Sequence, residues 1–140
     1  MADNRASTQI LVIRPVLKIA GGRVDLAWWD GEGAERPFGA LAVGGDPDHD
    51  WPGLAEAVAR ARADGCRQYV LDLERVPWIN SRGLGRLVEL WRGIDAGGGR
   101  LVLVCTSDRI RNILRISQLD DVLRPLPSLA DAAADLRGSD

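Results

Sequence analysis

Two short apolar runs, with a helical stripe between them, constrain the fold of this 140-residue chain more than any other feature. Residues 68–73 (Gln-Tyr-Val-Leu-Asp-Leu) and 101–105 (Leu-Val-Leu-Val-Cys) are apolar on both faces apart from Asp72, which is typical of strands that helices cover. Between them, apolar residues recur at helical spacing before the glycines at 97–99: Leu84, Leu87, Val88, Trp91 and Ile94. Strand, helix and strand in this order predict two parallel strands joined by a crossover helix.

The N-terminal half contains three further apolar segments and a helical pattern. Residues 10–19 predict a first strand, and Gly21 with Gly22 predicts a turn after it. Residues 24–28 alternate like a second strand, and 38–43 predict a third. Pro52 suits the first turn of a helix that ends at Gly65.

The C-terminal part continues the alternation of strands and helices. The hydroxyls and carboxylate of residues 106–108 (Thr-Ser-Asp) can cap a third helix, and 128–136 predict a terminal one. Between them, Val122 and Leu123 predict an edge strand. We therefore expect one α/β domain with a largely parallel sheet in its second half.

Composition excludes several classes of function. Twenty acidic residues against eighteen basic ones give a net charge of −2, which argues against nucleic acid as a partner. Cys66 and Cys105 fit neither a disulfide framework nor a zinc pattern, so both are expected to be reduced, buried thiols in a cytoplasmic protein. The first residues lack the apolar core of a signal peptide, and no stretch approaches the roughly 20 apolar residues that span a bilayer, so we expect no membrane insertion.

The segment 69–85 (Tyr-Val-Leu-Asp-Leu-Glu-Arg-Val-Pro-Trp-Ile-Asn-Ser-Arg-Gly-Leu-Gly) resembles the central signature of STAS domains, found in bacterial anti-sigma factor antagonists and sulfate transporters. The resemblance continues through 98–104, 110–123 and 128–132, and covers roughly residues 53–136. It implies a STAS-like α/β fold, a mixed sheet of four to six strands with about four helices mainly on one face. The chain would be a single such domain over 1–140, ordered over about 8–136, with an atypical region at 25–50.

In that family the signature usually reads Asp-Ser-Ser-Gly or Asp-Ser-Thr-Gly, and a cognate anti-sigma kinase phosphorylates the serine after the Asp. By position this serine is Ser81, while Asn80 replaces the Asp and Arg82 a small hydroxyl residue. The resemblance thus implies Ser81 as a phosphorylation site. It also implies a partner-binding surface around the start of the helix: Asn80, Ser81, Arg82, Gly83, Leu84, Arg86 and Arg109.

The chemistry of a helix N-terminus also supports a site at Ser81, independently of the resemblance. A serine that opens a helix presents its oxygen beside free backbone N–H groups, expected here to be those of Gly83 and Leu84, where negative charge is stabilised. A phosphate there would add about −1.5 to −2 charges to a docking surface. The plainer interpretation is that Asn80 or Ser81 only caps the helix, and that Gly83 and Gly85 only allow close packing.

Other candidate sites find less support. The spacing of Asp46, Asp48 and Asp50 resembles the start of a calcium loop, but Trp51 and Ala57 stand where the glycine and the bidentate glutamate are needed. His49 is the only histidine, so no catalytic triad assembles, and the glycines after Ser81 lack the Lys-Ser/Thr ending of a nucleotide-binding loop. We expect no enzyme activity, no catalytic or metal-binding residues and no cofactor.

Two surface features remain open. Arginines on the second and third helices either form a basic surface that binds an acidic partner or lie on a solvated face that Glu89 and Asp108 partly neutralise: Arg82, Arg86, Arg109, Arg111 and Arg115. Trp28 and Trp29 are adjacent in a strand, so one of them should point outward, either as an interface anchor or beneath the 25–50 region.

Two functions follow from the resemblance. The chain acts either as an anti-sigma factor antagonist, switched at Ser81 by a serine kinase and a phosphatase-type regulator, or as a scaffold without phosphate chemistry. The scaffold would be a subunit of a lipid ABC-type transport complex or of a stress-signalling assembly, and Asn80 and Arg82 favour it. Nucleotide binding, known for some family members, has no dedicated motif here. A homodimer is an open option.

Overall fold

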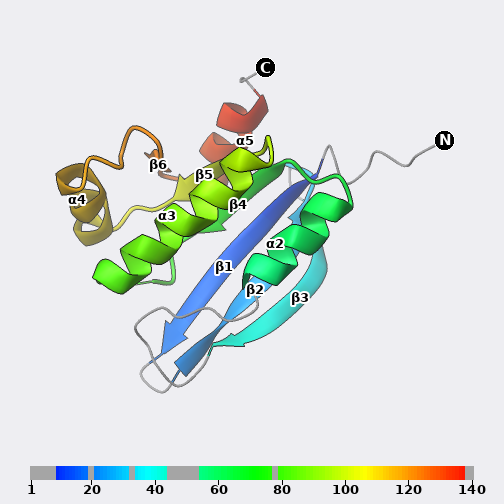
Figure 1. The fold of residues 1–140 in the computed structure, drawn as a ribbon, viewed down its shortest axis with the longest axis horizontal. Coiled ribbons are helices and arrows are strands. Elements are labelled where there is room, and N and C mark those ends of the chain that lie inside the picture. Colours follow the sequence, from blue (N-terminus) through cyan, green and yellow to red (C-terminus); the bar gives the residue numbers. More distant parts are fainter. Residues whose placement is uncertain (1–8, 19–20, 32–33, 44–53, 77–78, 138–140) are drawn as a thin grey trace.

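The computed structural model describes residues 9–18, 21–31, 34–43, 54–76 and 79–137. Its helices and strands follow in this order along the chain: β1 Ile10–Lys18, β2 Gly21–Trp29, β3 Glu35–Val43, α2 Leu54–Ala63, β4 Gln68–Asp72, α3 Ser81–Ala96, β5 Arg100–Val104, α4 Asp108–Ile116, β6 Pro125–Leu126 and α5 Leu129–Arg137. The strands form one six-stranded sheet in the order β3-β2-β1-β4-β5-β6 (Figure 1).

The sheet is mixed. β1, β4, β5 and β6 are parallel neighbours, as the alternation of strands and helices predicts. β2 and β3 add an antiparallel meander to the free side of β1. Most of the atypical region thus completes the sheet, since 25–29 belong to β2 and 35–43 form β3, whereas 32–33 and 44–50 lie outside the described residues.

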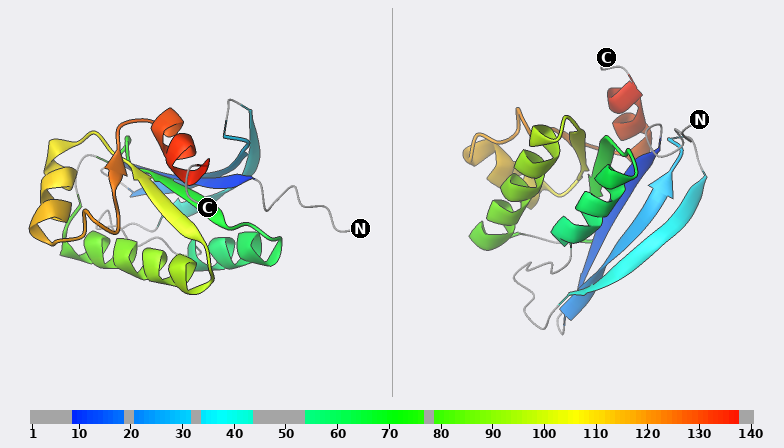
Figure 2. Two further views of the ribbon diagram at one scale, coloured as in Figure 1. Left: turned by 90° about the horizontal axis from the view of Figure 1, so that it is seen from above. Right: turned by 45° about the vertical axis from the view of Figure 1, so that its right-hand side comes forward.

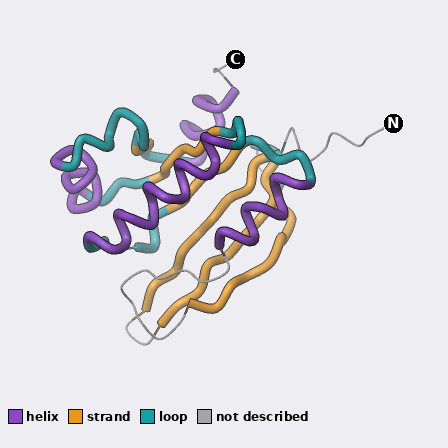
Figure 3. The backbone as a smooth tube through the Cα atoms, viewed as in Figure 1, coloured by secondary structure: helices purple, strands orange, loops and turns teal. Residues whose placement is uncertain are grey.

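Helices cover the two faces of the sheet unequally. α2, α3 and α4 pack on one face over the larger apolar cluster, which includes Leu11, Leu71 and Leu103. α5 lies alone on the other face, over a smaller cluster that includes Val12 and Val70 (Figure 2). Because successive strand residues point to opposite faces, β1 and β4 contribute to both clusters. The predicted mixed sheet with about four helices mainly on one face is confirmed. Figure 3 shows α2 and α3 lying across the near face of the strands.

Two local predictions are wrong. Gly21 and Gly22 belong to β2, because Lys18 pairs directly with Gly21 and the chain therefore reverses before it. The edge strand is β6 at Pro125–Leu126 and not Val122 with Leu123. The backbone N–H of Leu123 donates to Leu119 O at 2.8 Å, so this pair lies in a turn, and the fully buried Leu123 side chain anchors the turn to the core.

Candidate functional site

The predicted site lies where two helices begin at one edge of the sheet. α3 follows the carboxyl end of β4, and α4 follows that of β5; since these strands are parallel neighbours, both helices start at the same edge. Leu73 N, just after β4, donates a hydrogen bond to Val104 O at the end of β5, at 2.9 Å. The Thr106 hydroxyl also donates to Glu74 Oε2 at 2.8 Å. The segments that leave the two strands are therefore joined beside this edge of the sheet.

Asn80 caps α3. Its backbone is extended (φ −97°, ψ −175°), and its Oδ1 accepts a hydrogen bond from Gly83 N at 2.9 Å. Its carbonyl oxygen accepts the first intrahelical bond, from Leu84 N at 2.9 Å. The expectation that the N–H groups of Gly83 and Leu84 are free is therefore wrong, because the residue before Ser81 already uses both.

Ser81 is the first residue of α3, and its side chain is exposed. Its hydroxyl makes no hydrogen bond to any other residue in the described part of the chain. The cap and the hydroxyl thus belong to two different residues, so the Ser81 side chain is not needed to hold the helix start together.

The next residues differ in exposure. Gly83 is buried, and Leu84 is half-buried against the larger cluster, so neither offers much side-chain surface. Gly85 is exposed, and a Cβ added there meets no atom within 4 Å. Close packing therefore does not account for the glycine at 85, where the absence of a side chain leaves the helix surface flat.

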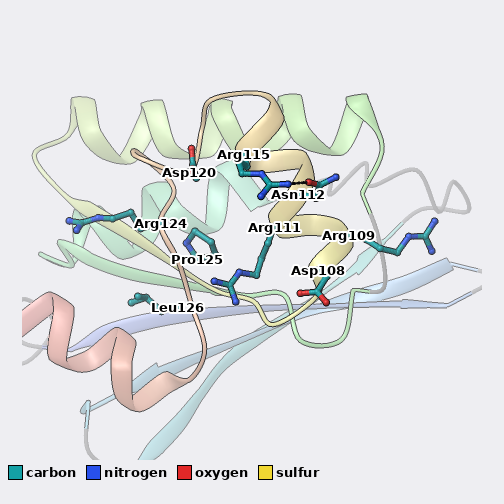
Figure 4. Close-up of a pocket in the computed structure, with 9 residues that line it drawn as sticks. All are labelled: Asp108, Arg109, Arg111, Asn112, Arg115, Asp120, Arg124, Pro125 and Leu126. Carbon is teal, nitrogen blue, oxygen red and sulfur yellow. Dashed lines mark hydrogen bonds between the residues drawn. The ribbon is translucent and has the colours of Figure 1, made fainter.

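Three arginines on the expected partner-binding surface are exposed: Arg82, Arg86 and Arg109. Arg86 Nη1 lies 3.1 Å from Glu89 Oε2 in an exposed pair one turn along α3, which contributes little to stability. Arg109 is the second residue of α4 and extends away from the other α4 arginines (Figure 4).

Arg109 also belongs to a hollow beside α4. It lines this hollow together with Arg111 and Arg115 of the same helix and with Arg124, which the sequence analysis did not single out. The α4 arginines therefore lie around one hollow, whereas Arg82 and Arg86 of α3 are not part of its lining.

Sequence reasoning missed a line of charged side chains across the sheet. Arg14 on β1 donates from Nε to Asp72 Oδ2 at 3.2 Å and from Nη1 to Glu35 Oε1 at 2.6 Å. Burial lowers the pKa of Arg14, but the hydrogen bonds and charges of the two carboxylates outweigh it and raise the pKa overall. Asp72 Oδ1 also accepts from Glu74 N at 3.0 Å, which fixes the chain as it leaves β4 toward α3. In the sequence, this ion pair was indicated only by Asp72, the single acidic residue in an otherwise apolar predicted strand.

Both cysteines are free and buried, as predicted. Burial raises the pKa of the Cys66 and Cys105 thiols, so both stay protonated near neutral pH.

Neither adjacent tryptophan is exposed. Trp29 is buried in the α5 cluster, and Trp28 packs edge-to-face on Phe38, with ring centroids 5.1 Å apart. Arg60 covers that Phe38 ring from α2, at 5.4 Å from its centroid. The two side chains do point to opposite faces of the sheet, but helices cover both faces.

Other predictions lie outside the described residues, namely those on Asp46, Asp48, His49 and Asp50. Of the helices in the described ranges, none has the length and apolar character to cross a membrane.

Comparisons with known proteins agree with the fold and identify the family. The STAS domain model matches residues 49–132, well over half of the chain. The anti-sigma-B factor antagonist of Staphylococcus aureus is 32% identical over 87 residues, which cover 61% of this chain and 81% of that protein. The crystal structure of a candidate anti-sigma factor antagonist from Thermotoga maritima superposes with a TM-score of 0.53 at 24% identity, covering 59% of this chain and 71% of that one, and shows the same fold. The chain belongs to the STAS domain family.

Proposed function

We propose that this protein is an anti-sigma factor antagonist, a regulator that binds a kinase-type anti-sigma factor through the surface around Ser81. The observation that carries this proposal is the exposed Ser81 hydroxyl, which no other described residue engages, at the first position of a helix that Asn80 already caps. A kinase can reach such a hydroxyl without unfolding the helix start. The relative in Staphylococcus aureus is named an anti-sigma-B factor antagonist, which supports the same class of partner.

Phosphorylation at Ser81 would act as a switch. The Ser81 oxygen attacks the γ-phosphorus of ATP held by the kinase, ADP leaves, and the hydroxyl proton passes to a base on the kinase. The positive end of the α3 dipole stabilises the new phosphoryl group.

The charge of the surface explains how the switch releases the partner. Arg82, Arg86 and Arg109 favour an acidic docking surface on the anti-sigma factor. A phosphoryl group of about −1.5 to −2 charges cancels much of that positive charge and adds bulk at the centre of the contact. An acidic partner then binds more weakly. Three residues of the expected surface would support it without contacting the partner extensively, because they are wholly or partly buried: Asn80, Gly83 and Leu84.

Incubation with ATP and the anti-sigma factor kinase of the same cell tests the phosphorylation. Intact-mass spectrometry should show the mass of one phosphate on the wild type, none on Ser81→Ala, and one on Ser117→Ala, which removes an exposed serine at the end of α4. A phosphate that persists in Ser81→Ala, or an unmodified wild type beside an anti-sigma kinase that is active on another substrate, would contradict the switch.

The second candidate is a scaffold or transport-complex subunit that works without phosphate. Asn80 and Arg82, which depart from the family signature, favour it. In that function the surface around Ser81 still binds a partner, but a negative charge at position 81 leaves the binding unchanged.

A further inference from the structure

A large hollow lies beside α4, between that helix, the segment that follows it and the short edge strand β6. Its volume is about 810 Å³. Its lining comes from three parts of the chain (Figure 4): Asp108, Arg109, Arg111, Asn112 and Arg115 from α4, Asp120 and Arg124 from the connection, and Pro125 and Leu126 from β6. We call it the α4–β6 groove.

The α4–β6 groove is basic in an acidic protein. Its lining has four arginines and two aspartates, a formal charge of +2, whereas the whole chain has −2. All four arginines are exposed, and within the described ranges no carboxylate forms an ion pair with Arg111, Arg115 or Arg124. Arg115 donates to the neutral side chain of Asn112. Guanidinium groups without carboxylate partners are available for the paired hydrogen bonds that they form with carboxylates.

The groove also offers apolar contacts. Pro125 and Leu126 are half-buried in its lining. Outside the lining, the two most exposed large apolar side chains in the described part of the chain are on the segments that border the groove, Ile116 at the end of α4 (71% exposed) and Val122 in the connection (40% exposed). Exposed apolar residues beside a charged hollow are typical of a protein-binding surface.

The α4–β6 connection is held in place by the core. Leu123 is fully buried, Leu119 is half-buried against the larger cluster, and Leu119 N donates to Leu114 O at 2.8 Å. Gln118 turns the chain at a positive φ of 59°. β6 is fixed to the sheet by the bond from Cys105 N to Leu126 O at 2.9 Å. A groove with walls fixed in this way requires little ordering when a ligand binds.

We propose that the α4–β6 groove is a second docking site, which binds an acidic linear segment of a partner protein that also carries apolar side chains. The arginines would pair with carboxylates of the segment, while Pro125 and Leu126 would contact its apolar residues. A nucleotide fits less well, because the lining contains no aromatic side chain on which a base could stack. Of the residues assigned above to the surface around Ser81, only Arg109 also lines the groove, and the variants below change Arg111 and Arg124 so that the two sites are tested separately.

Fluorescence anisotropy with a labelled peptide tests the groove. The probe is a peptide of about ten residues that repeats Glu-Glu-Leu, a length that an extended binding groove accommodates. Saturable binding is expected at low salt, weakening as the salt concentration rises. The double variant Arg111→Glu/Arg124→Glu should weaken the affinity about tenfold or more, since it replaces attraction by repulsion.

The matched control is Arg75→Glu/Arg92→Glu, the same two changes at exposed arginines outside the groove, and Arg92→Glu alone gives the effect of one; each should alter the affinity less than about twofold. Ser81→Asp should also leave it unchanged, so the result is separate from the test at Ser81. Circular dichroism and urea unfolding establish that each variant is folded. Lack of binding by the folded wild type, equal loss in Arg75→Glu/Arg92→Glu, or full displacement by inorganic phosphate at constant ionic strength would overturn the proposal, and the last result would leave only a site for small anions.

Discussion

At the scale of single residues, the start of α3 has one residue that caps the helix and another that presents an exposed hydroxyl. From the sequence alone, either Asn80 or Ser81 could be the cap. An Asn-Ser pair before an apolar stripe offers two capping side chains, and the backbone decides between them. The extended conformation of Asn80 makes it the cap, which leaves the Ser81 hydroxyl exposed. Sequence reasoning therefore predicted where the serine lies but assigned the wrong state to the amides of Gly83 and Leu84.

Removing the cap should cost stability. Asn80→Ala leaves the N–H of Gly83 without its acceptor, and the free energy of unfolding should fall by about 1 kcal/mol. Asn80→Asp, which restores the residue usual in the family, should stay within a few tenths of a kcal/mol of the wild type or above it, because a carboxylate caps as well and favours the helix N-terminus. Urea unfolding at neutral pH measures both variants. Equal stability of Asn80→Ala and wild type would show that this hydrogen bond contributes nothing.

At the scale of elements, α3 carries two glycines that packing does not require. A Cβ meets no atom within 4 Å at Gly85 or at Gly93, and both residues are exposed in the helix interior. Gly85 lies one turn after Ser81 on the same side of the helix, whereas Gly93 lies near the other end.

Alanine substitutions at Gly85 and Gly93 distinguish an effect on protein stability from an effect on partner binding. Gly85→Ala and Gly93→Ala should each raise the free energy of unfolding by about 0.5–1 kcal/mol, because glycine is a poor helix former. Only Gly85→Ala should weaken binding of the anti-sigma factor, since it adds a side chain to the flat surface beside Ser81. Urea unfolding and a titration with the partner measure the two effects. Equal affinity for both variants would place the contact elsewhere.

The elements themselves were predictable where a local pattern decides them. The stripe from Leu84 to Ile94 and the apolar runs at β4 and β5 identified the central strand–helix–strand unit. β6 was not predictable, because it consists of two residues, and its pairing with β5 depends on Leu123, which is anchored before it. Two adjacent apolar residues, Val122 and Leu123, suggested a short strand there. In the structure they lie in a turn, with Val122 exposed and Leu123 buried.

At the scale of the whole molecule, the sheet brings together segments that are distant in the sequence. The alternation in residues 24–28 predicted a strand, but the placement of β2 and β3 beside β1 depends on long-range register, which no local pattern contains. No local pattern predicts the salt bridge between Arg14 and Asp72 either, because these residues are 58 positions apart in the sequence. The parallel half of the sheet was predictable from the alternation of strands and helices, and the structure places the starts of the helices that carry Ser81 and Arg109 at one edge of it.

The central claim is that the surface around Ser81 binds an anti-sigma factor and that negative charge at Ser81 releases it. Isothermal titration calorimetry of the kinase-type anti-sigma factor against the wild type, Ser81→Asp and Ser128→Asp tests it most directly. Ser128 is the matched control, because it lies at the start of α5 on the opposite face, where its Oγ accepts from Asp131 N at 3.1 Å. An aspartate there adds the same charge far from Ser81 but loses the hydroxyl's bond to the Asp131 carboxylate, so circular dichroism establishes that this variant is folded. We expect the wild type and Ser128→Asp to bind alike and Ser81→Asp to bind about tenfold more weakly or worse. The same affinity for all three proteins would contradict the switch and favour a constitutive scaffold.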